Sequence, residues 1–219
     1  MKKRLLIGLL LLCLLSTYSI KFNKNFFSKL QIKNIEIENN QIIKKKEIKE
    51  KLSFLYETNF FLLRTKSIEN KLREIQFIES CHIKKVYPNN LRIKIIEKKP
   101  IAIIQKMKKK KYFTTKGDSI DFRDIKMFKD LPIVFGDEKS FSTFYLNLKN
   151  INFPFEEIKT FYFFESKRWD LLTSKNQLIK LPINNYNKSL LNFISLKDQA
   201  NFEKYKIFDY RIKDQLILK

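Results

Sequence analysis

The sequence predicts an α+β protein with three parts: an N-terminal transmembrane helix, a β-α-α-β-β domain, and a mixed strand-rich β domain with two helices. Three observations favour this class. Residues 5–20 carry no charge. Residues 32–99 switch between strand-like and helix-like hydrophobic spacing. After Pro100, short apolar segments alternate with turn residues. The predicted parts are a cytoplasmic tail (1–4), an anchor (5–22), a first domain (32–100) and a second domain (101–219).

The uncharged run at residues 5–20 follows three basic residues at positions 2–4. A helix needs about 20 apolar residues to cross a bilayer core, and Phe22 extends this run toward that length. A secretory signal peptide is the alternative, because it shares the basic start and the Leu-rich middle. The only small-x-small triplet, residues 17–19, is a weak cleavage site, which favours an uncleaved anchor. The short tail favours a cytoplasmic N-terminus and export of the remainder.

The composition narrows the classes of partner. The formal net charge of +22 is typical of proteins that bind nucleic acid or an anionic surface. Only 7 of the 45 basic residues are arginines, however, and the lysines are dispersed. This indicates a composition bias rather than a binding site. The densest run, residues 106–111, favours a solvated loop over a phosphate-binding patch. We therefore predict no nucleic-acid partner, although a domain this basic is compatible with weak contact to anionic lipid headgroups.

The first domain begins with a strand and a helix. Ile35 and Ile37 alternate with polar residues, as in a strand buried on one face. Residues 44–56 are predicted to form an amphipathic helix with Ile48, Leu52 and Leu55 on its buried side. Three lysines in its first turn oppose the helix dipole, so packing must hold that end.

A second helix and a hairpin complete the first domain. Thr65 or Ser67 is the predicted N-cap of a helix whose buried stripe consists of Ile68, Leu72 and Ile75. Residues 78–86 and 91–96 are predicted to pair as antiparallel strands around a turn at residues 88–90. The expected order is β-α-α-β-β.

The second domain is predicted from shorter segments. Strand-like runs occupy residues 101–104, 111–115, 119–122, 131–136, 157–164, 167–174, 177–181, 205–210 and 212–218. A helix is expected to start at Asp137 or Ser140 and to reach Asn150, and a second helix to run from Tyr186 to Gln199. Trp169 alternates with Leu171, which favours a core position for the indole.

No catalytic, cofactor or metal site is predicted. The one histidine, His82, follows Cys81, and neighbours on a strand point to opposite faces, so the two cannot converge as a nucleophile and base. One histidine and two cysteines are too few for a zinc site, and three glycines are too few for a phosphate loop. Asp209 and Arg211 are expected to form a local ion pair rather than an acid/base group.

Several motifs carry a resemblance to a known family. The segments at residues 35–39, 58–61 and 86–93, with the closing Glu97–Ala102, occur in an order that resembles a POTRA domain. POTRA domains are small modules of exported bacterial proteins that bind other polypeptides, often by strand addition. Further segments of the second domain resemble the FtsQ/DivIB cell-division family: residues 112–113, 117–118, 131–136, 168–171, 178–182 and 208–211. The sequence departs from that family at Lys175-Asn176, where Asn-Gly is usual.

The resemblance implies a function and a location. It implies a non-enzymatic bitopic scaffold of the bacterial divisome, in the inner membrane, with exported periplasmic domains and a concentration at the septum. It also implies small single-pass coiled-coil partners of the FtsB and FtsL type, and no cofactor or small-molecule substrate. The alternative is an anchored POTRA-containing export or outer-membrane assembly factor, which would differ by lacking a division phenotype on depletion.

The predicted partner site lies at the C-terminal run of the sequence. A strand at the edge of a sheet leaves backbone N–H and C=O groups for a partner strand, unless charges protect it. The resemblance favours the binding interpretation, and it implies that Arg168 offers a basic contact to an acidic partner residue. The predicted partner-binding residues are Arg168, Tyr210, Arg211, Ile212, Lys213, Asp214, Gln215, Leu216 and Ile217.

Overall fold

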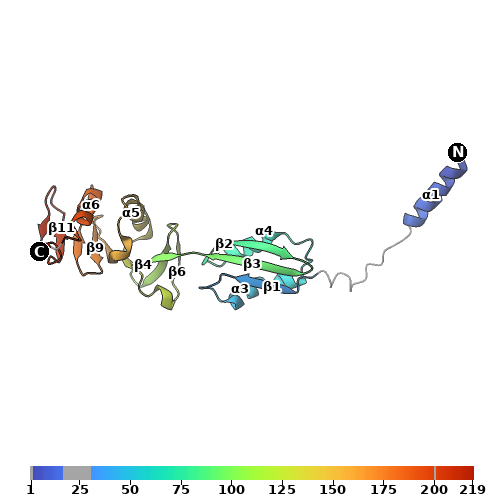
Figure 1. Ribbon diagram of the computed structural model, residues 1–219, viewed down its shortest axis with the longest axis horizontal. Coiled ribbons are helices and arrows are strands. Elements are labelled where there is room, and N and C mark those ends of the chain that lie inside the picture. Colours follow the sequence, from blue (N-terminus) through green and yellow to red (C-terminus); the bar gives the residue numbers. More distant parts are fainter. Residues whose placement is uncertain (1, 17–30, 200) are drawn as a thin grey trace. The chain divides into compact units, whose positions relative to one another are not determined.

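The protein is described by a computed structural model, in which residues 2–16, 31–199 and 201–219 are placed (Figure 1). The chain divides into two compact units, which are described separately below. Unit 1 consists of Met1–Ile75 and Ser80–Ile96, and unit 2 consists of Gln76–Glu79 and Glu97–Lys219. The boundaries after Glu79 and after Ile96 each fall within a strand rather than in a linker.

The hydrophobic N-terminal run begins in a helix, α1 (Lys2–Ser16). The predicted anchor at residues 5–22 coincides with this helix as far as Ser16, and its residues 17–22 lie outside the described residues. Among the residues described, no helix has both the length and the apolar character that crossing a membrane requires.

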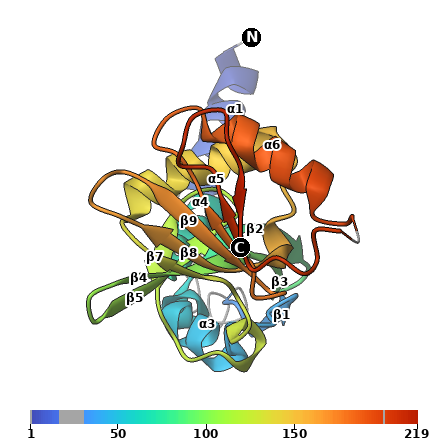
Figure 2. The same cartoon turned by 90° about the vertical axis from the view of Figure 1, so that its left-hand side faces the viewer.

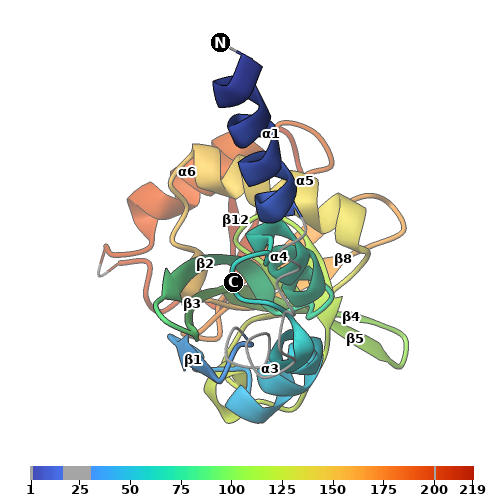
Figure 3. The ribbon, with the colours of Figure 1, turned by 90° about the vertical axis from the view of Figure 1, so that its right-hand side faces the viewer.

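Unit 1 has the predicted β-α-α-β-β order. Its elements are β1 (Asn34–Glu38), α3 (Lys45–Lys51), the 3₁₀ turn η1 (Ser53–Glu57), α4 (Thr65–Arg73), β2 (Ile78–Val86) and β3 (Asn90–Glu97). The sheet order is β1-β3-β2, and β1 runs parallel to β3 with Asn34 opposite Asn90. Figure 3 shows α3 and α4 on the same side of this sheet. Alternate residues of β1 and β3 are buried, which confirms the predicted alternation.

Two details of the helices in unit 1 differ from the prediction. The helix expected over residues 44–56 ends at Lys51, because at Leu52 the backbone changes from i→i+4 to i→i+3 hydrogen bonding and continues as η1. The N-cap of α4 is Arg64 rather than Thr65 or Ser67. The Ser67 hydroxyl instead donates to the Arg64 carbonyl, at 2.7 Å.

Unit 2 is built on a nine-stranded sheet with the order β12-β11-β10-β9-β8-β7-β4-β5-β6. The strands have these bounds: β4 (Pro100–Lys106), β5 (Lys109–Thr114), β6 (Ser119–Asp121), β7 (Ile133–Phe135), β8 (Ile158–Phe163), β9 (Trp169–Thr173), β10 (Leu178–Lys180), β11 (Ile207–Asp209) and β12 (Ile217–Leu218). The lysine run that was expected to form a loop instead forms the β4–β5 hairpin. Lys106 pairs with Lys109, so only residues 107–108 lie between the strands.

Two longer helices cover one side of this sheet. They are α5 (Glu138–Asn150) and α6 (Tyr186–Leu196), and Figures 2 and 3 show them next to each other from opposite directions. Of the two predicted starts, Asp137 and Ser140, the first is the N-cap of α5: its carboxylate accepts from the Ser140 backbone N–H at 2.9 Å. Two further 3₁₀ turns, η2 (Lys126–Phe128) and η3 (Phe155–Glu157), lie before β7 and β8.

Aromatic rings dominate the core between these helices and the sheet. Trp169 is 5 % exposed and stacks on Phe144, with ring centroids 4.7 Å apart, which confirms its predicted core position. Phe161 is fully buried and contacts the rings of Phe141 and Phe155 at 5.3 Å each. This cluster fixes the side of β8 and β9 that faces the helices, and therefore the side that faces away from them.

Candidate functional site

The strand β12 lies at one end of the sheet order in unit 2. It pairs antiparallel with β11, with Phe208 opposite Leu218 and Asp209 opposite Ile217. In the part of the chain that the structure describes, it is the last strand on that side of the sheet. One backbone edge of β12 therefore has no neighbouring strand among these residues.

The hydrogen-bond register shows which residue presents its backbone at this edge. Ile207 N–H donates to the Lys219 carbonyl at 2.9 Å, and Lys219 N–H donates to the Ile207 carbonyl at 3.1 Å. In an antiparallel ladder, residues next to such a reciprocal pair direct their N–H and C=O groups away from the partner strand. Leu218 is therefore the residue of β12 whose backbone points outward. It was not among the predicted site residues, because the register of this pair is not readable from the sequence.

The strand expected over residues 212–218 is shorter than predicted. Residues 212–215 form a turn closed by the bond from Gln215 N–H to the Ile212 carbonyl at 3.2 Å, and Asp214 has φ 56°. A left-handed residue cannot continue an extended strand, so pairing begins only at Ile217. Of the predicted partner-binding residues, the stretch from Arg211 to Gln215 is exposed in this turn, whereas Leu216 and Ile217 are half-buried.

Tyr210 is part of the core rather than of the exposed surface. It is 7 % exposed, and its hydroxyl donates to Asn192 Oδ1 on α6 at 2.9 Å. Its backbone N–H donates to the Lys180 carbonyl at 2.9 Å. Burial raises the pKa of the phenol above its usual value. Tyr210 therefore anchors the chain between β11 and the turn.

Arg211 forms the local ion pair that was predicted with Asp209. Its guanidinium donates to both carboxylate oxygens, with Nη2 to Oδ2 at 2.6 Å and Nε to Oδ1 at 2.8 Å. The hydrogen bond from Arg211 holds the pKa of Asp209 below its usual value. The ion pair therefore holds the Arg211 guanidinium and the Asp209 carboxylate in fixed positions beside the edge strand β12.

Arg168 lies in the turn before β9 and makes an analogous pair. Its guanidinium donates to Asp170 at 3.0 and 3.3 Å, and it lies over the ring of Phe164, 4.4 Å from the centroid. The Asp170 side chain is only 5 % exposed. The contacts that the structure records for Arg168 are therefore internal to unit 2.

The register brings these charged groups onto one row across four strands. Asp170 lies opposite Lys180, Lys180 opposite Asp209, and Asp209 opposite Ile217. Residues directly opposite one another share a face of the sheet. The side chains of Leu216 and Leu218 pack against the core cluster under the helices, so this row lies on the other face. Arg168 and Arg211, through their aspartates, therefore flank Lys180 on the face away from the helices. The sequence did not indicate Lys180.

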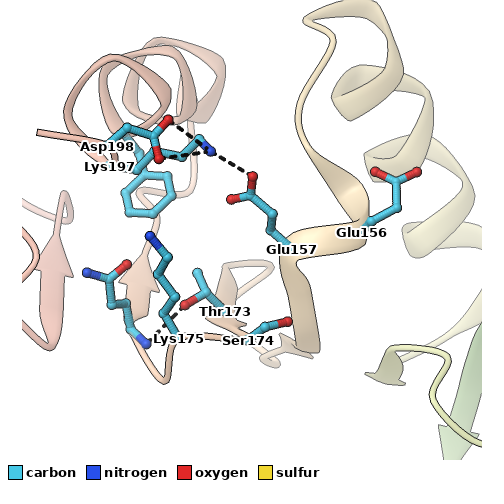
Figure 4. Close-up of a pocket in the computed structure, with 9 residues that line it drawn as sticks. Glu156, Glu157, Thr173, Ser174, Lys175, Lys197 and Asp198 are labelled. Carbon is cyan, nitrogen blue, oxygen red and sulfur yellow. Dashed lines mark hydrogen bonds and ion pairs between the residues drawn. The ribbon is translucent and has the colours of Figure 1, made fainter.

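A polar pocket of about 320 Å³ lies elsewhere in unit 2 (Figure 4). Lys197 bridges Glu157 at 2.7 Å and Asp198 at 3.2 Å, and these hydrogen bonds, chiefly that to Glu157, raise the pKa of the ammonium group. In Figure 4, Glu156 points away from this group of charges. Lys197, Glu157 and Asp198 are all engaged in these ion pairs, so we assign no reaction to the pocket. No group of His, Cys, Asp or Glu suited to a metal ion occurs in the described ranges.

Comparison with known proteins shows that the chain is similar to cell-division proteins. A family model described as "POTRA domain, FtsQ-type" matches residues 30–98. Cell division protein FtsQ of Rickettsia typhi is 26 % identical over 189 residues, covering 84 % of this chain and 71 % of the relative. Cell division protein FtsQ of Rickettsia prowazekii is 27 % identical over 190 residues, covering 84 % and 70 %.

A solved structure shows a weaker similarity. The major extracytoplasmic domain of the trans isomer of the cell-division protein DivIB from Geobacillus stearothermophilus aligns with a TM-score of 0.34 and 11 % identity. The alignment covers 48 % of this chain and 96 % of that structure.

Proposed function

We propose, from its similarity to cell-division proteins of the FtsQ/DivIB family, that this chain belongs to that family and is a non-enzymatic scaffold of the bacterial division complex. The N-terminal hydrophobic run anchors it in the inner membrane, with the tail in the cytoplasm and both units in the periplasm. It gathers at the septum and links early and late division proteins. Its partners are small single-pass coiled-coil proteins of the FtsB and FtsL type.

The position of β12 at the end of the sheet is the observation that carries this proposal. A partner segment that pairs with the outward N–H and C=O of Leu218 extends the sheet of unit 2 by one strand. Backbone pairing of this kind supplies affinity with little dependence on the side chains of β12. Strand addition would also give β12, which has only two residues, hydrogen bonds on its outer side.

The row of charges next to this edge supplies selectivity. Lys180, with the arginines on either side of it, gives the face away from the helices three cationic groups beside two aspartates. The net charge of this row is positive, so it favours acidic residues in the partner segment. We propose that Arg168, while paired with Asp170, contributes to this attraction for acidic residues of the partner.

Proline at position 218 tests the proposal sharply. Leu218→Pro removes an N–H that points away from β11, so the ladder inside the protein keeps its hydrogen bonds. Leu218→Ala is the matched control, because it keeps the N–H and loses only side-chain packing. We expect Leu218→Pro to abolish co-purification with the FtsB-type partner and to produce filamentous cells. Leu218→Ala is expected to retain partner capture.

The readouts separate loss of binding from loss of folding. Hydrogen exchange of β8 and β9 in the isolated chain reports whether unit 2 remains folded in each variant. If Leu218→Pro folds and still captures the partner at the wild-type level, strand addition at β12 is wrong. Normal septation after depletion of the protein would remove the division role itself.

A further inference from the structure

Unit 1 exposes three large apolar side chains at one place. Phe61, Leu62 and Tyr87, which we call the entry-end patch, are 55 %, 79 % and 69 % exposed. Phe61 and Tyr87 contact each other with ring centroids 6.0 Å apart. The three residues come from two segments, the loop before α4 and the end of β2, so the patch is a product of the fold. Exposed apolar groups that gather in this way mark an interaction surface.

The patch is rigidly supported from below. Phe60 is fully buried, and its ring meets those of Phe61 and Tyr87 edge-on at 5.7 and 5.4 Å. Lys85 Nζ donates to the Phe60 carbonyl at 2.9 Å and lies over the Phe60 ring at 5.5 Å. Phe61 and Tyr87 are thus held in place by the buried Phe60 ring, which Lys85 contacts in turn.

The patch lies at the end of unit 1 where the chain enters from the hydrophobic N-terminal run. Gln31 forms a β-bridge with Asn59, two residues before Phe61. Lys33 N–H donates to the carbonyl of Asn89, two residues after Tyr87, at 2.9 Å. In Figure 1 the β2–β3 turn and the start of β1 lie at the same end of the sheet. Gln31 follows Ile20, the last residue of the uncharged run, by only eleven positions.

Basic residues adjoin the patch. Lys33 and Arg64 are exposed on the two segments that border it, and Lys85 supports it. Aromatic side chains are favoured at the interface between the hydrocarbon core and the lipid headgroups, and lysine and arginine next to them are attracted to anionic headgroups. An aromatic patch with cationic neighbours, next to the point where an anchored chain enters the domain, has the chemistry of a lipid-facing surface.

We propose that the entry-end patch rests on the outer surface of the membrane that anchors the protein, with Phe61, Leu62 and Tyr87 in the interfacial layer and the basic residues on anionic headgroups. The inference rests on the membrane anchoring in the proposed function. It gives unit 1 a fixed orientation on the bilayer, so that the anchor does not act as a free tether.

Tryptophan at position 62 provides the test. The full chain is reconstituted into vesicles of phosphatidylcholine and phosphatidylglycerol, with and without bromine on the acyl chains. Leu62→Trp is expected to lose roughly half of its added emission to the brominated lipid, because an interfacial indole lies beside the acyl chains. Trp169 is buried in unit 2 and supplies the baseline in the wild-type chain. Met107→Trp, in the exposed β4–β5 turn, is the matched control and should remain at that baseline.

Salt and lipid charge refine the result. Quenching of Leu62→Trp should fall in vesicles of phosphatidylcholine alone and at high salt, because both remove the attraction between the basic residues and the headgroups. Tyr87→Trp is a second reporter, for the case in which Leu62→Trp does not fold.

Four outcomes overturn the inference. A chain that does not float with the vesicles contradicts both the anchor and the patch. A chain that floats, but whose reporters at positions 62 and 87 stay at the baseline, leaves the anchor intact and contradicts the patch alone. Equal quenching at position 107 shows general adsorption of a basic protein. If unquenched reporters coincide with loss of partner co-purification in Leu62→Glu, the patch binds a polypeptide instead.

Discussion

The two units offer different kinds of surface for binding. Unit 1 presents side chains, because the entry-end patch consists of exposed rings and a leucine on a buried support. Unit 2 presents backbone, because the outward groups of β12 belong to the main chain of Leu218. A surface made of side chains is sensitive to the chemistry of each residue. A backbone edge tolerates most side chains and is sensitive to proline and to register.

The largest expected effect is the loss of stability of unit 1 when Phe60, the buried support of the entry-end patch, is removed. Phe60→Ala deletes a fully buried ring and should destabilise unit 1 by about 3–5 kcal/mol. Phe61→Ala, next to it, removes a ring that is 55 % exposed and should cost far less. Urea unfolding of the two variants measures the difference. Equal losses would mean that the patch residues are core residues and that the contrast between the units is false.

An intermediate loss of stability is expected at Arg168, whose side chain is proposed to contribute to partner binding by unit 2. Arg168→Ala leaves the buried Asp170 carboxylate without its guanidinium partner, so we expect a loss of about 1–3 kcal/mol. Capture of the partner should weaken as well if the proposed acidic contact exists. Comparing the unfolding free energy with co-purification yield separates the two roles. If Arg168→Ala unfolds with the same free energy as the wild type, the ion pair with Asp170 contributes nothing to stability.

The smallest effect concerns acid stability at the edge of the sheet. Arg211 lowers the pKa of Asp209 in the folded protein, so the carboxylate contributes stability above its unfolded pKa of about 3.9, and this is lost as the pH falls through the folded pKa. Asp209→Asn should therefore flatten the dependence of the unfolding midpoint on pH below about 4. Thermal unfolding at a series of acidic pH values measures this slope. An unchanged slope would mean that the ion pair is absent in solution.

Prediction from the sequence worked well where a pattern repeats within one element. The alternation of Ile35 and Ile37, and the spacing of Ile68 and Leu72, identified a strand and a helix whose buried faces the structure confirms. It failed where a single residue changes the backbone. Leu52 ends α3 by a switch in hydrogen bonding, and Asp214 adopts a left-handed conformation that stops the predicted terminal strand. Neither change alters the hydrophobic pattern.

Only part of the candidate site could be predicted from the sequence. The ion pair of Asp209 and Arg211 was predicted, because residues two apart on an extended segment share a side. Tyr210 was predicted to bind the partner, but it is buried and donates a hydrogen bond to Asn192 of α6. Leu218 and Lys180 were missed, because their importance depends on which strand lies opposite which.

The amino-acid sequence by itself therefore determined the α+β class, the β-α-α-β-β order of the first unit and the core position of Trp169 in the second. These follow from hydrophobic periodicity, which each element carries within its own residues. Only the tertiary structure decided that β12 lies at the end of the sheet, that Leu218 directs its backbone outward, and that Phe61 and Tyr87 meet. Those features arise from pairing and packing between segments far apart in the sequence, and no local pattern encodes them.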